Sequence, residues 1–281
     1  MELFIVAIDE AAEVWASDTG CTQPLGVSPW AQPVPSAVEL DALLRATAAV
    51  RSRAERTVYC SFDHSHLFRS VEVPAEPAPD LKVCTRGLLE LMPSPIDEQD
   101  MDLVVDLPGA ATRRVVAHAH RGQEAGEQRV LSRLSEAGFP DPVFEYTDLA
   151  LTSALVTRGL GMGGEPVVFF QFFPRHFEAL AVARAVPHLF YQSPPDADPK
   201  QALRTWELLS SNSPTAVCGG DAGRCEAFGA DFRRATGKAI TRITSDTGSF
   251  VLDGLRSRTR VWAGRRSYSQ TTAAGGKPKG R

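Results

Sequence analysis

Phe4-Ile-Val-Ala-Ile-Asp-Glu-Ala-Ala-Glu-Val-Trp-Ala16 predicts a strand, a turn and a returning strand, because two apolar runs flank a short polar centre. The pattern recurs at Glu165-Pro-Val-Val-Phe-Phe-Gln-Phe-Phe-Pro-Arg-His-Phe-Glu-Ala-Leu-Ala-Val-Ala183 and continues through Pro187-His-Leu-Phe-Tyr191. We therefore expect each half of the chain to open with a β-hairpin. Ala216-Val-Cys-Gly-Gly-Asp-Ala222 predicts a strand that ends in a paired-glycine turn before a helix.

The composition indicates a folded, cytoplasmic protein. The chain has 281 residues, 43% of them hydrophobic, which is enough for a sizeable core in one large or two medium domains. The formal net charge of −4 argues against a nucleic-acid-binding protein, because no bulk positive field is present to neutralise phosphates. No apolar run approaches the roughly 20 residues that a membrane-spanning helix requires, and the acidic N-terminus does not resemble a signal peptide.

Helical and strand patterns alternate along the rest of the chain. Ser36-Ala-Val-Glu39 has the form of a helix capping box, and Leu40 and Leu43 belong to the apolar face of the helix that follows. The segment from Gln23 to Pro35 is predicted to be a proline-rich connector. Further strands are predicted at 56–62, 67–73, 100–107, 113–120, 142–146 and 239–243, and further helices at 80–91, 124–138, 148–155, 199–211, 226–236 and 248–255.

Residue patterns for catalysis and metal binding are weak. The chain has no Gly-x-Ser-x-Gly elbow, His-Glu-x-x-His motif or Walker loop. Asp63-His64-Ser65-His66 is the only tight cluster of catalytic residue types, and a polar turn between strands explains it better than a catalytic relay. His118 and His120 share one face of a predicted strand, but the sequence designates no third ligand. The five cysteines include no Cys-x-x-Cys pair, so we expect reduced thiols. From all of these patterns together we expect no metal site and no catalytic residue.

The order hairpin, hairpin, glycine turn resembles the actin and sugar-kinase ATPases. The middle of the chain also resembles PilM and GspL, actin-like cytoplasmic components of type IV pilus and type II secretion machines. That resemblance rests on the succession Leu67-Phe-Arg-Ser-Val-Glu-Val-Pro74, Leu91-Met-Pro-Ser-Pro95, an acidic strand at 100–106, Val130-Leu-Ser-Arg-Leu-Ser-Glu-Ala-Gly-Phe-Pro140 and Asp148-Leu-Ala-Leu-Thr-Ser-Ala154.

The resemblance implies an α/β, actin-like (ribonuclease H-like) fold of two lobes. We expect the first lobe at 1–68 and 142–164, an inserted α+β subdomain at 69–141 and a reduced second lobe at 165–264. The strand 142–146 should return to the sheet that contains 3–8 and 56–62. Residues 265–281 are rich in Arg, Lys, Gly and Ser without apolar periodicity, so we expect a disordered basic tail.

In this fold the two hairpin turns grip phosphate, and the glycine turn lies against the adenosine. Here Asp9 occupies the position of the first acidic residue, but Glu10 replaces the neighbouring glycine and should repel a phosphate. The second turn is Phe172-Phe-Pro174, which lacks a carboxylate and includes a proline without an amide donor. Gly219 and Gly220 remain, although a tight turn needs such glycines for steric reasons alone. Asp9, Gly219 and Gly220 are thus the candidate remnant of a nucleotide cleft.

The resemblance implies a non-catalytic scaffold on the cytoplasmic side of the inner membrane. Its partner would be the cytoplasmic segment of a single-pass membrane protein, PilN-like or GspM-like, with a hexameric assembly ATPase as a second contact. A peptide groove lined chiefly by Phe68 and Val71 is the predicted binding site. Two alternatives stay open: an actin-like protein that binds ATP and Mg²⁺ weakly or for regulation, and a relative of small-molecule kinases.

Overall fold

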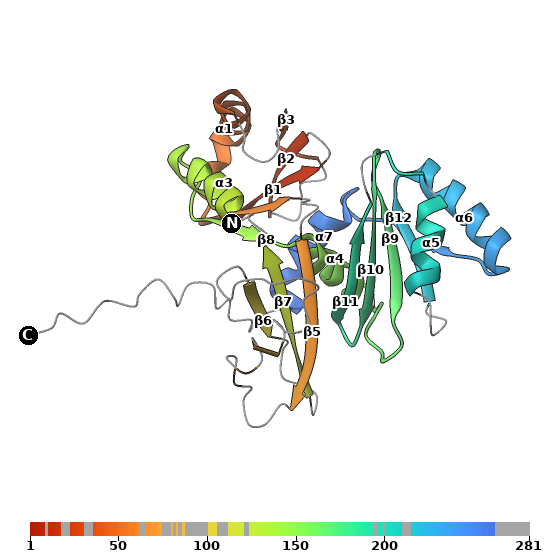
Figure 1. The fold of residues 1–281 in the computed structure, drawn as a ribbon. Coiled ribbons are helices and arrows are strands. Elements are labelled where there is room, and N and C mark those ends of the chain that lie inside the picture. The colour runs from red at the N-terminus through yellow and green to blue at the C-terminus, as the bar shows by residue number, and fades with distance from the viewer. Residues whose placement is uncertain are drawn as a thin grey trace, which may run out of the picture. The chain divides into compact units, whose positions relative to one another are not determined.

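A computed structural model describes residues 1–8, 11–17, 23–30, 36–61, 66–74, 80, 83, 86–87, 101–105, 112–120, 124–193, 196–198, 200–209 and 215–261 (Figure 1). The chain separates into two compact units. The larger unit consists of Met1–His64 and Gln123–Val261, and the smaller one contains Ser65–Gly122.

The first lobe of the larger unit is built on a five-stranded mixed sheet in the order β3-β2-β1-β4-β8. The predicted first hairpin is present as the antiparallel pair β1 (Glu2–Ile8) and β2 (Ala11–Ala16), and β3 (Gly26–Pro29) extends it. Its other strands, β4 (Arg56–Ser61) and β8 (Pro142–Glu145), run parallel to β1. The prediction that segment 142–146 returns to the sheet of 3–8 and 56–62 is therefore confirmed.

The second lobe repeats this plan with a second five-stranded mixed sheet, β11-β10-β9-β12-β13. The second hairpin consists of β9 (Val167–Phe172) and β10 (Phe177–Ala183), extended by β11 (Val186–Gln192). β12 (Thr215–Gly220) runs parallel to β9, and the short β13 (Thr241–Arg242) runs parallel to β12. Three antiparallel strands followed by two parallel ones thus occur twice along the chain.

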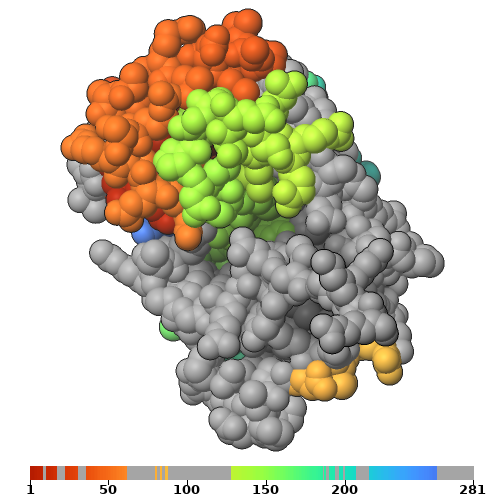
Figure 2. Space-filling view, turned by 90° about the vertical axis from the view of Figure 1, so that its left-hand side faces the viewer, coloured from red at the N-terminus to blue at the C-terminus, as the bar shows by residue number. Residues whose placement is uncertain are grey.

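Two helices cover the outer face of the first sheet. Figure 2 shows α1 (Ala37–Arg51, orange) beside α3 (Glu124–Glu136, green) on the surface of this lobe. The predicted capping box begins α1, because the Ser36 hydroxyl accepts from the Glu39 amide and the Glu39 carboxylate accepts from the Ser36 amide. The apolar faces of both helices enter one core with the sheet, formed by Leu3, Ile5, Val14, Tyr59, Leu40, Leu43, Val130 and Leu134 among others.

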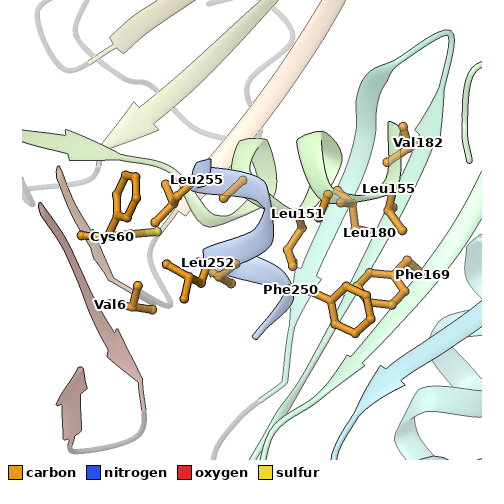
Figure 3. Close-up of a cluster of buried hydrophobic side chains, with 14 of the residues drawn as sticks. Val6, Cys60, Leu151, Leu155, Phe169, Leu180, Val182, Phe250, Leu252 and Leu255 are labelled. Atoms are coloured by element: carbon orange, nitrogen blue, oxygen red, sulfur yellow. The ribbon is translucent and has the colours of Figure 1, made fainter. Parts of the chain in front are cut away.

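The inner faces of the two sheets share a core that contains α4 (Thr147–Val156) and α7 (Phe250–Val261) (Figure 3). Val6 and Cys60 of the first sheet and Phe169 and Leu180 of the second belong to this cluster. The side chains of residues 147–155 are all buried. The hydroxyl groups of Thr152 and Ser153 donate to the carbonyls of Asp148 and Leu149 one turn earlier, which satisfies these polar groups inside the core.

A buried ion pair ties the end of α4 to α7. The Arg158 guanidinium lies 2.7 Å from the Asp253 carboxylate, whose side chain is 5% exposed. The same carboxylate accepts from the Thr247 hydroxyl at 2.7 Å and from the amides of Asp246 and Thr247. Because the bonds from Asp246 and Thr247 hold the loop before α7 against the Asp253 carboxylate, this network fixes where that helix begins.

The smaller unit contains a three-stranded antiparallel sheet in the order β5-β7-β6. Its strands are β5 (His66–Pro74), β6 (Met101–Val105) and β7 (Thr112–His120), which agrees with three predicted strands. β5 is an edge strand of this sheet, because it pairs with β7 alone there.

The structure differs from the sequence analysis in several elements. The segment predicted as a connector contains β3, which pairs with β2 although it is short and ends in a proline. The helix predicted at 226–236 begins four residues earlier, as α6 (Ala222–Thr236), because Asp221 caps it. α3, which the sequence analysis assigned to the inserted subdomain, lies in the larger unit and packs on the first sheet. α5 (Lys200–Leu209) agrees with its prediction, whereas 265–281 lies outside the described residues.

The closest approach of α4 and α7 leads to a first prediction. A Cβ atom at Gly254 of α7 would overlap the carbonyl group of Ala150 on α4. We expect Gly254→Ala to lower the free energy of unfolding by about 3 kcal/mol, because backbone must move to admit a methyl group in a packed core. Gly223→Ala is the matched control, since a Cβ there would lie 3.6 Å from its nearest neighbour, the Asp221 carboxylate. Urea unfolding of both variants tests this, and equal midpoints would contradict it.

Candidate functional site

The turn of the second hairpin is held by an arginine from a distant helix. Arg224, in the first turn of α6, donates through Nη1 to the carbonyls of Phe173, Pro174 and His176 at 2.7, 3.0 and 3.1 Å. Its Nη2 donates to the carbonyl of Ala197 at 3.3 Å. The carbonyl oxygens of this turn therefore converge on a cation that belongs to the protein itself.

The rest of the turn is closed by contacts within the chain. The Phe173 amide donates to the His176 carbonyl at 2.9 Å, and the two rings stack with centroids 4.5 Å apart. Arg175 pairs with Asp196 at 3.1 Å on the surface. The hydrogen bond and the charge of Arg175 lower the pKa of the Asp196 carboxyl, so this contribution to stability is present above the unfolded-state pKa and is lost as the pH falls through the folded-state value.

The paired glycines at the end of β12 are packed against protein atoms. At Gly219 a Cβ would lie 2.5 Å from the Phe250 ring, and at Gly220, where φ is +96°, it would overlap the Phe172 carbonyl. The next residue, Asp221, donates its amide to the same Phe172 carbonyl, and its side chain caps α6 by accepting from the Arg224 amide at 2.8 Å. Close packing of the turn therefore explains both glycines without a ligand.

A row of polar residues crosses the inner face of the second sheet beside these glycines. Glu178 of β10 lies opposite Gln171 of β9 and Gln192 of β11, and Gln171 lies opposite Gly219 of β12. Glu178 is 0% exposed and Gln171 3%, whereas their neighbours on the same face are apolar. Burial of the Glu178 carboxyl group and the Gln171 amide costs free energy unless their polar atoms have partners, so apolar packing of the sheet alone does not account for these two residues.

The predicted site residues are only partly described. Asp9 lies outside the described residues, so the first phosphate turn of the prediction is not placed. Gly219 and Gly220 lie where β12 meets α6, as predicted. Phe68 and Val71 lie on β5, opposite His118 and Val115 of β7, and the structure describes their backbone only.

The sequence analysis did not identify Arg224, Gln171 or Glu178 as functional candidates. A signal was present for the two strand residues, because each is a single polar residue inside a strand that is buried along its whole length. Arg224 carries no such signal, since its acceptors lie about fifty residues earlier in the chain. Among the described residues, no group of three or more His, Cys, Asp or Glu side chains is arranged to hold a metal ion.

Several solved structures share this arrangement of strands and helices. The chain superposes on a PilM–PilN type IV pilus biogenesis complex with a TM-score of 0.65 and 12% identity, covering 92% of this chain and 98% of that one. The chain has the actin-like fold. A Bacteroides thetaiotaomicron protein with an actin-like ATPase fold and unknown function matches with a TM-score of 0.54 and 10% identity, over 91% of this chain and 95% of that one.

A solved structure from a secretion system has a similar fold. The cytoplasmic domain of EpsL, an inner-membrane component of the type II secretion system of Vibrio cholerae, matches with a TM-score of 0.53 and 14% identity, over 91% of this chain and 94% of that one. The predicted fold and the predicted likeness to PilM and GspL-type proteins are thus confirmed at the level of structure. No protein-family model matches the chain, and no curated protein matches it in sequence. In the described part of the chain, no helix has both the length and the apolar character needed to cross a membrane.

The bonds of Arg224 lead to a second prediction. We expect Arg224→Ala to lower the free energy of unfolding by about 2 kcal/mol, because several carbonyls lose a charged donor, and to speed amide exchange in the turn 172–177. Arg224→Lys should recover only part of the loss, because a lysine ammonium group keeps the positive charge but lacks the planar fork of donors that a guanidinium offers. Arg233→Ala, on an exposed position of the same helix, is the control. Equal unfolding free energies for the 224 and 233 alanine variants would contradict the assignment.

Proposed function

We propose that this protein is a non-catalytic cytoplasmic scaffold of a pilus-assembly or secretion platform, peripheral to the inner membrane. The observation that carries the proposal is the likeness to PilM over nearly the whole length of both chains, in a complex that also contains PilN. The likeness to cytoplasmic EpsL, from an inner-membrane component of a secretion system, supports the same class of machine.

The absence of catalysis is the second part of the proposal. A phosphate group needs N–H donors or a bound cation, whereas the second turn directs three carbonyls toward Arg224 and contains a proline. Gln171, near the C-terminal end of β9, is neutral and cannot neutralise Mg²⁺ as a carboxylate would. In the first turn the sequence places Glu10 beside Asp9, where a second negative charge disfavours an anion.

The partner is the third part of the proposal. A PilN-like or GspM-like membrane protein would insert an extended cytoplasmic segment beside β5. Support comes from the position of β5 at the edge of its sheet, because an edge strand offers unpaired backbone groups to which a peptide can add as a further strand. Phe68 and Val71 are the proposed side-chain determinants on that strand.

A third prediction concerns the affinity of the protein for ATP. Isothermal titration with ATP and Mg²⁺ should detect no binding tighter than millimolar, because the second hairpin turn directs carbonyls toward Arg224 and the sequence of the first turn places Glu10 beside Asp9. An actin-like ATPase measured in parallel is the positive control. Micromolar affinity that Asp9→Ala abolishes would replace the scaffold with the alternative, an actin-like protein that binds ATP weakly or for regulation.

A fourth prediction concerns the proposed binding of the partner's cytoplasmic segment to β5. Phe68→Asp should weaken binding of a peptide from the cytoplasmic segment of the PilN-like protein of the same genome by at least about tenfold, because a charge replaces an apolar contact. Val38→Asp is the matched control, since Val38 is 75% exposed on α1 of the larger unit. Fluorescence anisotropy measures affinity, and circular dichroism checks the fold. If Phe68→Asp folds and binds like Val38→Asp, the proposed site on β5 is wrong.

A further inference from the structure

Three histidines share one face of the sheet in the smaller unit. In the antiparallel register of β5 and β7, His66 lies directly opposite His120. His118 precedes His120 by two residues on β7, and residues two apart lie on the same face of a strand. The register therefore places His66, which lies about fifty residues earlier in the chain, beside the histidine pair for which the sequence analysis found no third ligand.

An aspartate adjoins this group on the third strand. β7 lies between β5 and β6 in the sheet (Figure 1), and Asp102 of β6 lies directly opposite His118. Asp102 therefore shares the face of the three histidines. These placements come from the register, since the structure describes the three strands by their backbone.

The other face of the same sheet is almost entirely apolar. Its cross-strand sets are Leu67 with Ala119 and Met101, Arg69 with Ala117 and Leu103, and Val71 with Val115 and Val105. An antiparallel sheet commonly has one apolar and one polar face, which accounts for polar residues on the histidine face. It does not account for three of the chain's six histidines at two adjacent cross-strand positions.

The spacing of these positions suits a single metal ion. Directly opposite residues of an antiparallel pair have Cβ atoms about 4.5–5.5 Å apart, and residues two apart on one strand are about 7 Å apart. A zinc–nitrogen bond is about 2.0–2.1 Å long, and each imidazole ring adds its own length between Cβ and the metal. Three imidazoles at these separations can therefore meet at one ion.

We propose that His66, His118 and His120 bind a Zn²⁺ ion through imidazole nitrogens, and that Asp102 accepts a hydrogen bond from the His118 ring. Imidazole nitrogens suit zinc, whereas Mg²⁺ and Ca²⁺ take oxygen ligands. A carboxylate that accepts from a metal-binding histidine fixes the orientation of its ring. Three protein ligands leave the fourth tetrahedral position of the zinc ion to water or to a donor from another molecule.

The ion would link the edge strand to the middle strand of the sheet. β5 pairs with β7 alone in this sheet, and the metal adds a bridge from His66 to His118 and His120 at one end of that ladder. Zinc should therefore raise the melting temperature of the smaller unit, because the folded sheet holds the ligands together and the unfolded chain does not. The site does not depend on the proposed scaffold function.

The fifth prediction measures zinc binding by the full chain. The protein is stripped of metal with a chelator, kept reduced, and titrated with zinc chloride in competition with a chromophoric chelator. We expect one Zn²⁺ per chain with a Kd of about 1 μM or tighter. Co²⁺ in place of zinc should give the visible absorption of a tetrahedral ion without the ultraviolet charge-transfer band of a thiolate ligand, which distinguishes this site from binding by the cysteines.

Single substitutions test each assigned residue. His66→Gln, His118→Gln and His120→Gln should each weaken zinc binding by at least about a hundredfold, and Asp102→Asn should weaken it by about tenfold. His188→Gln, on β11 of the larger unit, is the matched control and should bind zinc like the unchanged protein. Circular dichroism without metal checks that each variant folds.

A chemical measurement on the unchanged protein covers the case of a variant that does not fold. Diethyl pyrocarbonate modifies accessible histidines, and zinc should protect His66 in the tryptic peptide Thr57–Arg69 and both histidines of Val115–Arg121, while His188 reacts equally with and without zinc. Absence of zinc binding, a thiolate band with Co²⁺, equal modification of these two peptides in both conditions, or loss of binding in His188→Gln would overturn the proposal.

Discussion

The contact between α4 and α7 is the constraint on which the larger unit depends. Both five-stranded sheets direct an apolar face toward these helices, and the shared core contains residues of both sheets and both helices. The helices can fill that space only if their backbones approach closely, which is why position 254 has no side chain where it meets Ala150. The pair of Arg158 and Asp253 then fixes the start of α7, because removal of either partner would leave a charge in a largely buried place.

The duplicated lobes share a topology but differ in the chemistry of their hairpins. In the second lobe the turn is organised around the guanidinium of Arg224, so the ligand of its carbonyls is a part of the chain. Cations attract carbonyl oxygens and phosphates attract N–H groups, and one turn conformation cannot easily serve both. The polar groups of this turn are therefore committed to internal bonds, and Glu178 with the two flanking glutamines is the polar feature of the inner face of the sheet.

The glycine turn connects these features in the second lobe. Gly219 packs on Phe250 of α7, and Gly220 packs on the end of β9, so the turn touches one central helix and the second hairpin. Cys218 and Cys225 lie on either side of it, and Arg224 extends from it. A change in the bonding of this short segment would therefore reach both the hairpin turn and the helix that follows it.

The sequence by itself predicted the features that depend on neighbouring residues. Two hairpins, the Ser36 capping box and the strand that ends at Gly219 and Gly220 follow from local patterns of apolar residues, caps and glycines, whereas the return of segment 142–146 was implied by the resemblance to PilM and GspL. Tertiary structure alone decided the contacts between distant segments: the partners of Arg224, the row through Gln171 and Glu178, the pairing of β3, and the place of α3 on the first sheet. The physical reason is that the size and polarity of a side chain are fixed by its residue type, whereas the groups that it contacts depend on how sheets and helices pack around one core.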